Sequence, residues 1–465
     1  MKWMVAWLAW LGLASTAVAA DEDKDLDLIP RTEPAAKPAV ATGAAGSPAR
    51  IYLENALMFS TLRNELLVPS PPPLPPHWEE RLFGDARVEW PLGPNATVAY
   101  SGRLNVATSE DVGFPNRDNV THDLRELHLS VEPRPRDYLD LGRINVKSGV
   151  ALGFNPTDFF KARAVVDPLT ADPSVLRENR LGTLMVRGQH VGDGGSVSLV
   201  YAPKVTEPAP VGADPNRGFS PLFGRTNASN RWLVKGSARL RDDISPELLL
   251  FGENGHTKIG ANLTENIGQS MVAYVEWSGG RRLGIIDEAL AFGRQTGTIP
   301  DSAPDVINQG GKEQFRSQAA IGASYTTENK ITFNLEYHYN GAGFSSDDWR
   351  RWFAAGEEQS ASSPIARQLW YVRAYAAERQ EPLQRHAVVL RMDWVDLLVP
   401  KLELTGFALA DVRDGSTLLQ LSADYAASDF WSFGVLAAAT TGGRRSNFGS
   451  LPQESTVLFN VQRYF

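Results

Sequence analysis

The chain has 465 residues, no cysteine, 43% hydrophobic residues and a formal net charge of −8. The absence of cysteine excludes disulfides, thiolate metal sites and cysteine nucleophiles, and the negative charge argues against nucleic acid as a partner. The mean hydropathy is −0.25, and no run of about 18 apolar residues, the length a membrane helix needs, follows residue 20. At roughly 150 residues per domain, composition alone suggests a soluble chain of about three domains.

The N-terminus has the layout of an export signal. Lys2 supplies a positive start, residues 4–13 are mostly apolar, and Ala17-Val18-Ala19 matches a signal-peptidase site. We expect residues 1–19 to be a signal peptide; the alternative is a buried first helix. Residues 20–49 are charged and then rich in Ala and Pro, which predicts a disordered periplasmic linker.

From residue 50 to residue 465, apolar and polar residues alternate with a period of two in many segments, which is typical of β-strands. In the clearest segment, residues 330–340, Ile, Phe, Leu and Tyr alternate with Thr, Asn, Glu and His. Each segment is about ten residues long, enough for a tilted strand to cross a bilayer. A single segment is better explained by a half-buried strand of a soluble sandwich or solenoid, so the connections must decide.

The connections between these segments alternate between short and long. Short turns lie near residues 91–95, 133–136, 192–195, 241–245, 265–268, 327–329, 397–400 and 427–429. Long connections lie near residues 62–83, 109–121, 148–178, 204–228, 280–313, 341–383 and 442–454, with two tight ones on the same side at residues 254–255 and 413–416. This arrangement predicts an all-β fold, a transmembrane antiparallel β-barrel of about sixteen to eighteen strands with long extracellular loops.

In such a barrel the polar face of each strand lines the lumen and the apolar face meets lipid. The basic lumen candidates are Arg87, Arg103, Arg187, Arg231, Lys235, Arg239, Lys258 and Arg316. The acidic candidates are Glu276, Glu336, Asp393, Glu403 and Asp424, with Asp85, Glu89 and Glu126 earlier in the chain. Two interpretations stay open: a transverse field that orients polar solutes, or opposite charges that pair across neighbouring strands.

Residues 148–178 form the most distinctive loop, because Phe154, Phe159 and Phe160 stand among charged residues. One interpretation is a loop that folds into the barrel and narrows the lumen; the other is a loop that packs over the rim. If the loop enters, Asp158, Lys161 and Arg163 are the constriction candidates.

The longest loop, residues 341–383, contains two helical segments. One begins at the acidic pair Asp347-Asp348, and the other follows Ser363-Pro364. A cap on the rim of the barrel is the favoured interpretation; a surface binding site and a stiffened rim are the alternatives.

The last strand places Val457, Phe459, Val461 and the terminal Phe465 on one face. This pattern resembles the C-terminal signature of Gram-negative outer-membrane β-barrels, which end in an aromatic residue; Arg463 departs from it, since that position is usually apolar or aromatic. A second stretch, Gly142-Arg143 followed by the segment from Gly153 to Asp158, is also similar to segments of porin-like barrels. The resemblance implies that the barrel assembly machinery recognises the C-terminal residues, and that loop 148–178 narrows the lumen, as the third loop does in general porins.

Catalytic motifs are missing from the sequence. It has no phosphate-binding or dinucleotide-binding glycine pattern and no H-E-x-x-H, and none of its seven histidines has metal-ligand spacing. We therefore expect no enzyme activity, no metal and no cofactor.

The leading hypothesis is a passive outer-membrane channel for small hydrophilic solutes, with outer-membrane lipid and the barrel assembly machinery as further partners. Its oligomeric state stays open. One alternative is a channel or scaffold component of an envelope export system, with residues 20–49 as a tether. The other is an outer-membrane hydrolase, which would need a Ser or Asp beside His128 or His386.

Overall fold

A computed structural model describes residues 49–110, 119–165, 176–177, 179–212, 219–241, 244–304, 306–308 and 310–465. The predicted signal peptide lies outside these ranges, and so does the predicted linker except for its last residue. Residues 111–118 and 166–175, which belong to two of the predicted loops, are also outside them.

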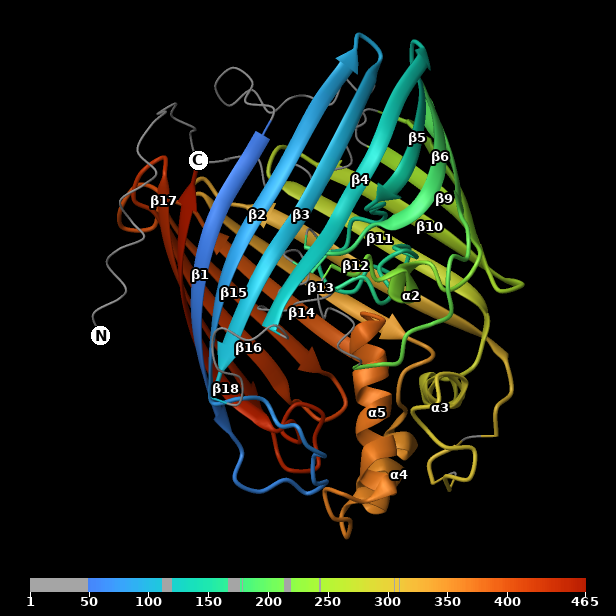
Figure 1. The fold of residues 1–465 in the computed structure, drawn as a ribbon, viewed down its shortest axis with the longest axis vertical. Coiled ribbons are helices and arrows are strands. Elements are labelled where there is room, and N and C mark those ends of the chain that lie inside the picture. The colour runs from blue at the N-terminus through green and yellow to red at the C-terminus, as the bar shows by residue number, and fades with distance from the viewer. Residues whose placement is uncertain are drawn as a thin grey trace.

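Eighteen strands form one closed antiparallel barrel (Figure 1). Each strand pairs with the next along the chain, and β18 pairs with β1 to close the ring. Closure leaves no sheet edge, so the ladders satisfy the backbone groups without water. The strand number confirms the upper value predicted from the connections.

The strands are β1 Ala49–Leu62, β2 Trp78–Gly93, β3 Ala96–Ser109, β4 Val120–Arg134, β5 Asp137–Ile144, β6 Thr183–Gly192, β7 Gly195–Ala202, β8 Arg231–Ala238, β9 Ile244–Glu253, β10 His256–Ile267, β11 Met271–Arg282, β12 Gln314–Thr326, β13 Ile331–Asn340, β14 His386–Trp394, β15 Leu402–Asp411, β16 Thr417–Ala426, β17 Trp431–Thr441 and β18 Gln453–Tyr464. The short turns lie at one end of the barrel and the long connections at the other, as predicted.

The two faces of each strand differ sharply in character. In β13, Leu335 is 57% exposed on the outside of the barrel, whereas the next residue, Glu336, is 1% exposed on the inside. The same inversion recurs around the barrel, where large apolar side chains such as Ile51, Leu199, Ile321 and Phe459 are exposed. An apolar outer surface around a polar interior is the reverse of a soluble protein and fits a lipid surround.

The long connections carry four helices within the described residues: α2 Phe223–Thr226, α3 Ile285–Gln295, α4 Ser346–Gly356 and α5 Pro364–Glu378. The two helices predicted in residues 341–383 are α4 and α5. Ser345 and Asp348 form a capping box at the start of α4, and Ser363 caps α5. The sequence analysis missed α3, which lies in the predicted loop 280–313.

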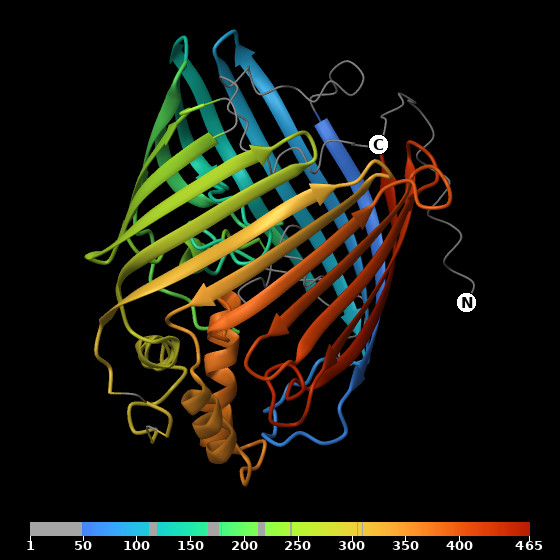
Figure 2. The ribbon, with the colours of Figure 1, turned by 180° about the vertical axis from the view of Figure 1, so that it is seen from behind.

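Helices α3, α4 and α5 pack together at the long-connection end of the barrel (Figure 2). Trp349 and Trp352 of α4 are fully buried in their shared hydrophobic core, which Leu290 of α3 and Leu369 of α5 complete. The helices therefore form a folded cap on this rim. None of the helices in the described ranges is long and apolar enough to cross a membrane.

Candidate functional site: a loop inside the barrel

The described part of the connection between β5 and β6, residues 145–165, 176–177 and 179–182, folds into the barrel rather than over its rim (Figure 2). Phe159 stacks on Phe251 of β9 with ring centroids 4.7 Å apart, and Phe160 meets the same ring edge-on at 5.8 Å. Around them lie inward apolar residues of β6 to β9, including Met185 and Leu249. The adjacent aromatics of the loop therefore fill an apolar patch on the inner wall.

The loop also reaches the opposite part of the wall. Phe154 packs against a second inward apolar cluster, which includes Val389 of β14 and Phe407 of β15. Its ring also meets that of His338 on β13 edge-on, at 6.1 Å. The segment from Phe154 to Phe160 thus crosses the lumen between two apolar patches of the inner wall.

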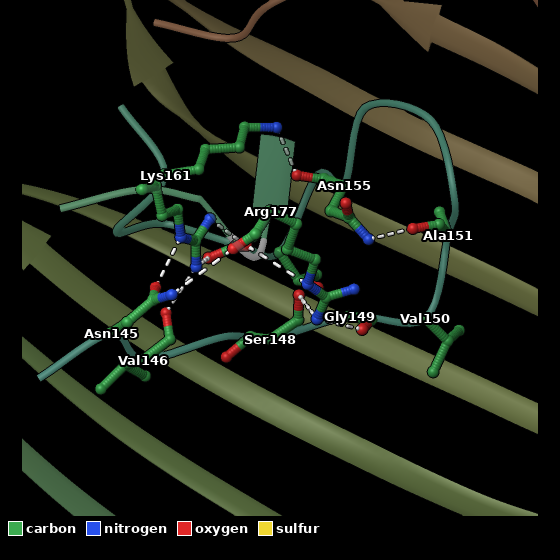
Figure 3. A network of polar contacts seen from close by, with 12 residues as sticks. Asn145, Val146, Ser148, Gly149, Val150, Ala151, Asn155, Lys161 and Arg177 are labelled. Atoms are coloured by element: carbon green, nitrogen blue, oxygen red, sulfur yellow. Dashed lines mark hydrogen bonds and ion pairs between the residues drawn. The ribbon is translucent and has the colours of Figure 1, made fainter. Parts of the chain in front are cut away.

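Polar contacts within the loop fix its shape (Figure 3). The Arg177 guanidinium donates to the carbonyl oxygens of Ser148 and Gly149 at 3.1 and 2.9 Å. The Lys161 ammonium donates to the Asn155 carbonyl at 2.5 Å, and the Asn155 amide donates in turn to the Ala151 carbonyl. A loop with this many internal bonds to buried carbonyl groups is held in one conformation.

A buried ion pair joins Arg180, near the end of the connection, to Asp158 in its middle. Arg180 and Asp158 lie 2.7 Å apart and are both almost fully buried. Arg180 also donates to the Asn145 side chain at 2.6 Å and to the Val146 carbonyl at 2.8 Å. Because Arg180 satisfies groups on both sides of the loop, its removal would leave a buried carboxylate and a buried carbonyl unpaired.

Two carboxylates of the barrel wall hold the tip of the loop. Glu276 of β11 accepts hydrogen bonds from the backbone amides of Val150 and Ala151. Glu336 of β13 accepts from the next two amides, of Leu152 and Gly153. Four consecutive backbone donors of the loop are therefore paired with the wall.

Two glycines allow this close approach. A Cβ added to Gly149, whose φ is +81°, would lie 2.5 Å from Oε1 of Glu276. A Cβ on Gly153 would lie 2.6 Å from Nε2 of His338 and 3.0 Å from Glu336. Only a residue without a side chain fits between the loop and these wall groups.

The three constriction candidates named from the sequence all lie on or beside this loop, and each has a specific partner. Asp158 pairs with Arg180. Arg163 pairs with Glu378 of α5 at 3.0 Å and stacks over the Phe292 ring of α3, so it ties the loop to the cap.

Lys161 is the third candidate. Burial lowers the pKa of its ammonium to about 8, although the neighbouring Asp158, Glu381 and Glu276 carboxylates oppose that shift. Its partner is a carbonyl oxygen rather than a carboxylate at ion-pair distance.

Several predicted lumen charges are paired across strands. Arg103 lies 2.9 Å from Asp85, which also binds Arg125 at 2.7 Å. Two more cross-strand pairs join Arg187 to Asp140 at 2.7 Å and Lys235 to Glu247 at 2.9 Å, whereas Asp393 pairs with Arg391 at 2.9 Å within β14 and Arg87 pairs with Glu89 at 3.8 Å within β2. These placements favour pairing of opposite charges, across strands or within one strand, over a transverse field for the residues concerned.

The remaining lumen candidates have other surroundings. Arg231 is buried over the Phe160 ring at 5.0 Å, Arg316 donates to the Gly341 carbonyl at 2.8 Å, and Glu126 accepts from the Asn145 amide at 3.0 Å. Lys258 faces the lumen from β10, and Glu403 and Asp424 lie opposite each other in the β15–β16 register.

For Arg239 only the strand boundary needs correction, and its place along the lumen stays a prediction. Strand β8 ends at Ala238, and Arg239 lies in the exposed turn that follows. The alternation was extended one residue too far because Leu240 continues the apolar pattern, although it belongs to the turn.

Sequence reasoning missed the partners that fix the loop. Arg177 and Arg180 are loop residues with no periodicity to mark them, and their role depends on carbonyl groups they meet only in the folded chain. Tyr274, which donates to Glu336, and Arg125 are similarly defined by long-range contacts. In the described residues, no group of three or more His, Asp or Glu side chains could hold a metal ion.

The C-terminal strand presents Val457, Phe459 and Phe465 on the outer face, and Val461 follows the same alternation. Arg463 lies on that face too, with its guanidinium 5.2 Å from both the Trp431 and the Phe465 ring centroids. Stacking between two rings explains how a charged side chain fits an apolar surface. Recognition of these residues by the barrel assembly machinery stays a prediction.

Comparison with known proteins agrees with this architecture. No protein-family model and no curated protein matches the sequence. The crystal structure of Pseudomonas aeruginosa OccK11 (OpdR) aligns over 90% of this chain and 95% of its own, with a TM-score of 0.50 and 12% identity. That of Pseudomonas aeruginosa OccK5 (OpdH) covers 90% and 97%, with a TM-score of 0.51 and 10% identity. The chain has a porin-type β-barrel fold. At this level of identity the likeness concerns the fold alone.

Proposed function

We propose that this porin-type barrel is an outer-membrane channel of a Gram-negative bacterium, through which small hydrophilic solutes pass passively. The observation that carries the proposal is the closed 18-stranded barrel with an apolar outer surface and a polar interior. Barrels of 16 to 18 strands are wide enough to enclose an aqueous channel. The apolar surface then meets lipid, and the polar interior keeps water in the lumen.

The infolded loop and the charges around it set the selectivity of this channel. Residues 145–165 cross the lumen, so solutes must pass beside them. Because most nearby charges are paired, the passage presents dipoles and ion pairs rather than one strong field. Such a lining favours polar solutes selected mainly by size.

The proposal is tested by swelling of liposomes that contain the purified full chain. Uncharged sugars of increasing size are added outside, and the optical density is followed as solute and water enter. We expect swelling that slows steeply as the sugar becomes larger. Liposomes that swell no faster than protein-free ones, with the barrel folded in them, would overturn the proposal.

The alternatives receive no comparable support. An export scaffold tethered through residues 20–49 rests on a segment that lies almost entirely outside the described residues. For a hydrolase, His386 lies at the outer face, where Nδ1 contacts the Tyr337 hydroxyl at 2.6 Å, and Nδ1 of His128 has no hydrogen-bond partner among the described residues. Neither histidine forms part of a Ser–His or Asp–His pair there.

A further inference from the structure

We propose that Glu336, together with Glu276, is a positioning residue that sets the open width of the lumen by fastening the loop tip, residues 149–153, to the wall of β11 to β13. This inference rests on the proposed channel function and names the residues on which its size selectivity depends. Three features support it. Each carboxylate accepts hydrogen bonds from two backbone amides of the loop tip, and the strand between the two carboxylates carries small residues that leave room for the loop. Glu276 receives both amides on one oxygen, whereas Glu336 receives one amide on each oxygen.

Glu276 is completely buried and is satisfied by neutral donors. Oε1 accepts from the amides of Val150 and Ala151, and Oε2 lies 3.2 Å from the Thr157 hydroxyl, whose single proton is shared with the Asn262 side-chain oxygen 2.9 Å away. Among the described residues, no Lys or Arg lies within ion-pair distance of it. A buried carboxylate without a cation is costly unless hydrogen bonds satisfy it, so Glu276 is stable here only while the loop is in place.

Glu336 uses both oxygens for the loop. Oε1 accepts from the Leu152 amide and the Tyr274 hydroxyl, and Oε2 accepts from the Gly153 amide at 2.8 Å. Nε2 of His338 lies 2.7 Å from the same Oε2. Tyr274 and His338 therefore orient this carboxylate from the wall, while the two loop amides bind it from the lumen.

The strand between the two carboxylates is built of small residues at this level. On β12, Gly322 lies opposite Glu336 and Ala320 lies opposite Glu276. A Cβ on Gly322 would be 2.7 Å from the Glu336 side chain and 2.8 Å from the Tyr274 ring. Ala320 is fully buried and packs with Ala151 of the loop. The wall thus leaves room for the carboxylates to reach the loop and for the loop to lie flat.

The two sites respond differently to an amide in place of the carboxylate. In Glu276→Gln, the carbonyl oxygen at the Oε1 position still accepts both backbone amides, and the new NH2 group donates to the Thr157 hydroxyl, which itself donates to Asn262 at 2.9 Å. In Glu336→Gln, each oxygen position faces one backbone amide, so the NH2 group meets a donor whichever way it is turned. One buried amide of the loop is then left unpaired.

The expected consequence is greater release of the loop tip in Glu336→Gln than in Glu276→Gln. Leaving one buried amide without a partner costs about 1–3 kcal/mol, a shift of about 5- to 150-fold toward the released state. A released tip leaves the wall and enters the open part of the lumen. Single-channel conductance in planar bilayers should therefore fall and its open-state noise rise in Glu336→Gln relative to the wild type, and both effects should be smaller in Glu276→Gln, which keeps an acceptor for both of its loop amides.

A second readout reports the loop directly and does not depend on ion flow. Because the chain has no cysteine, Ala151→Cys introduces a single thiol at a position that is 1% exposed. Its modification by a small, charged thiosulfonate reagent should be slow in the wild-type background and faster in Glu336→Gln than in Glu276→Gln. In the Glu336→Gln background it should be at least about fivefold faster, in proportion to the released fraction.

The outcomes separate this inference from the proposed function. Equal modification rates and equal conductance in the three backgrounds would overturn the positioning role and leave the channel intact. A folded wild-type barrel without conductance would overturn the proposed channel function, whatever the modification rate of the Ala151→Cys thiol. If Glu336→Gln does not fold, Glu336→Asp takes its place, because its shorter side chain cannot reach both amides. Its conductance and its rate of thiol modification are then compared with those of the wild type.

Discussion

At the scale of single residues, Lys161 is the constriction candidate whose charge should change within an accessible pH range. Burial lowers the pKa of its ammonium to about 8, against about 10.4 for an exposed lysine. As the pH rises through 8, the amine loses its proton and the constriction loses one positive charge. We therefore predict that preference for anions over cations decreases between about pH 7 and pH 9.

The measurement is the reversal potential of the channel across a salt gradient at each pH. Lys161→Met keeps the length of the side chain without its charge and is the control, since its reversal potential should be constant over this range. A wild-type reversal potential that is equally constant would contradict the assignment.

Gly149 offers a second test at this scale, with a matched control elsewhere in the barrel. Gly149 and Gly255 both have a φ of +81°, but an added Cβ meets Glu276 at the first and nothing within 4 Å at the second. Alanine at either position costs about 1–2 kcal/mol of backbone strain. Only Gly149→Ala should also displace Glu276, and so change the conductance.

Thermal unfolding and conductance together check this prediction. Both variants should unfold at a slightly lower temperature than the wild type. Gly255→Ala should keep the wild-type conductance, and the expectation for Gly149 is wrong if Gly149→Ala keeps it as well.

At the scale of elements, the infolded loop and the barrel wall depend on each other unequally. The barrel closes through its own ladders, whereas the loop is held by Phe159, Phe160 and the two wall carboxylates. Phe159→Ala removes the stack on Phe251 and should loosen the loop without unfolding the barrel. An aromatic pair contributes about 0.5–1.5 kcal/mol beyond its buried area.

Hydrogen exchange followed by mass spectrometry checks this separation. In Phe159→Ala, exchange in residues 155–165 should become faster, while exchange in β1 to β5 stays slow. Phe219→Ala, at a ring that is 76% exposed, is the control and should change neither region. Faster exchange throughout the barrel would show that loop and wall unfold as one unit.

The alternation of residues and the lengths of the connections were enough to predict the strands, because each strand of a barrel contacts its sequence neighbours and carries its own two-faced pattern. The helix signals at Ser345 and Ser363 are equally local. Helix α3 was missed because its first residue follows a glycine that makes no side-chain cap.

The site was less predictable because it depends on partners distant in the sequence. The aromatics of the loop indicated that it enters the barrel, yet Glu276 and Glu336 were named only as lumen charges. Their role as acceptors for four loop amides, more than a hundred residues away in the chain, arises from the fold.

At the scale of the whole molecule, a chain whose average hydropathy is that of a soluble protein forms a barrel with an apolar exterior. Half of each strand is apolar and half is polar, so the average conceals the segregation of the two faces. We propose that the interior of this barrel is a water-filled passage narrowed, but not closed, by residues 145–165.

Reconstitution of the purified full chain in planar lipid bilayers tests that claim most directly. The structure predicts discrete, ohmic conductance steps whose size scales with the salt concentration, as expected for ions moving through water. Folded, inserted barrels that give no conductance steps would contradict it.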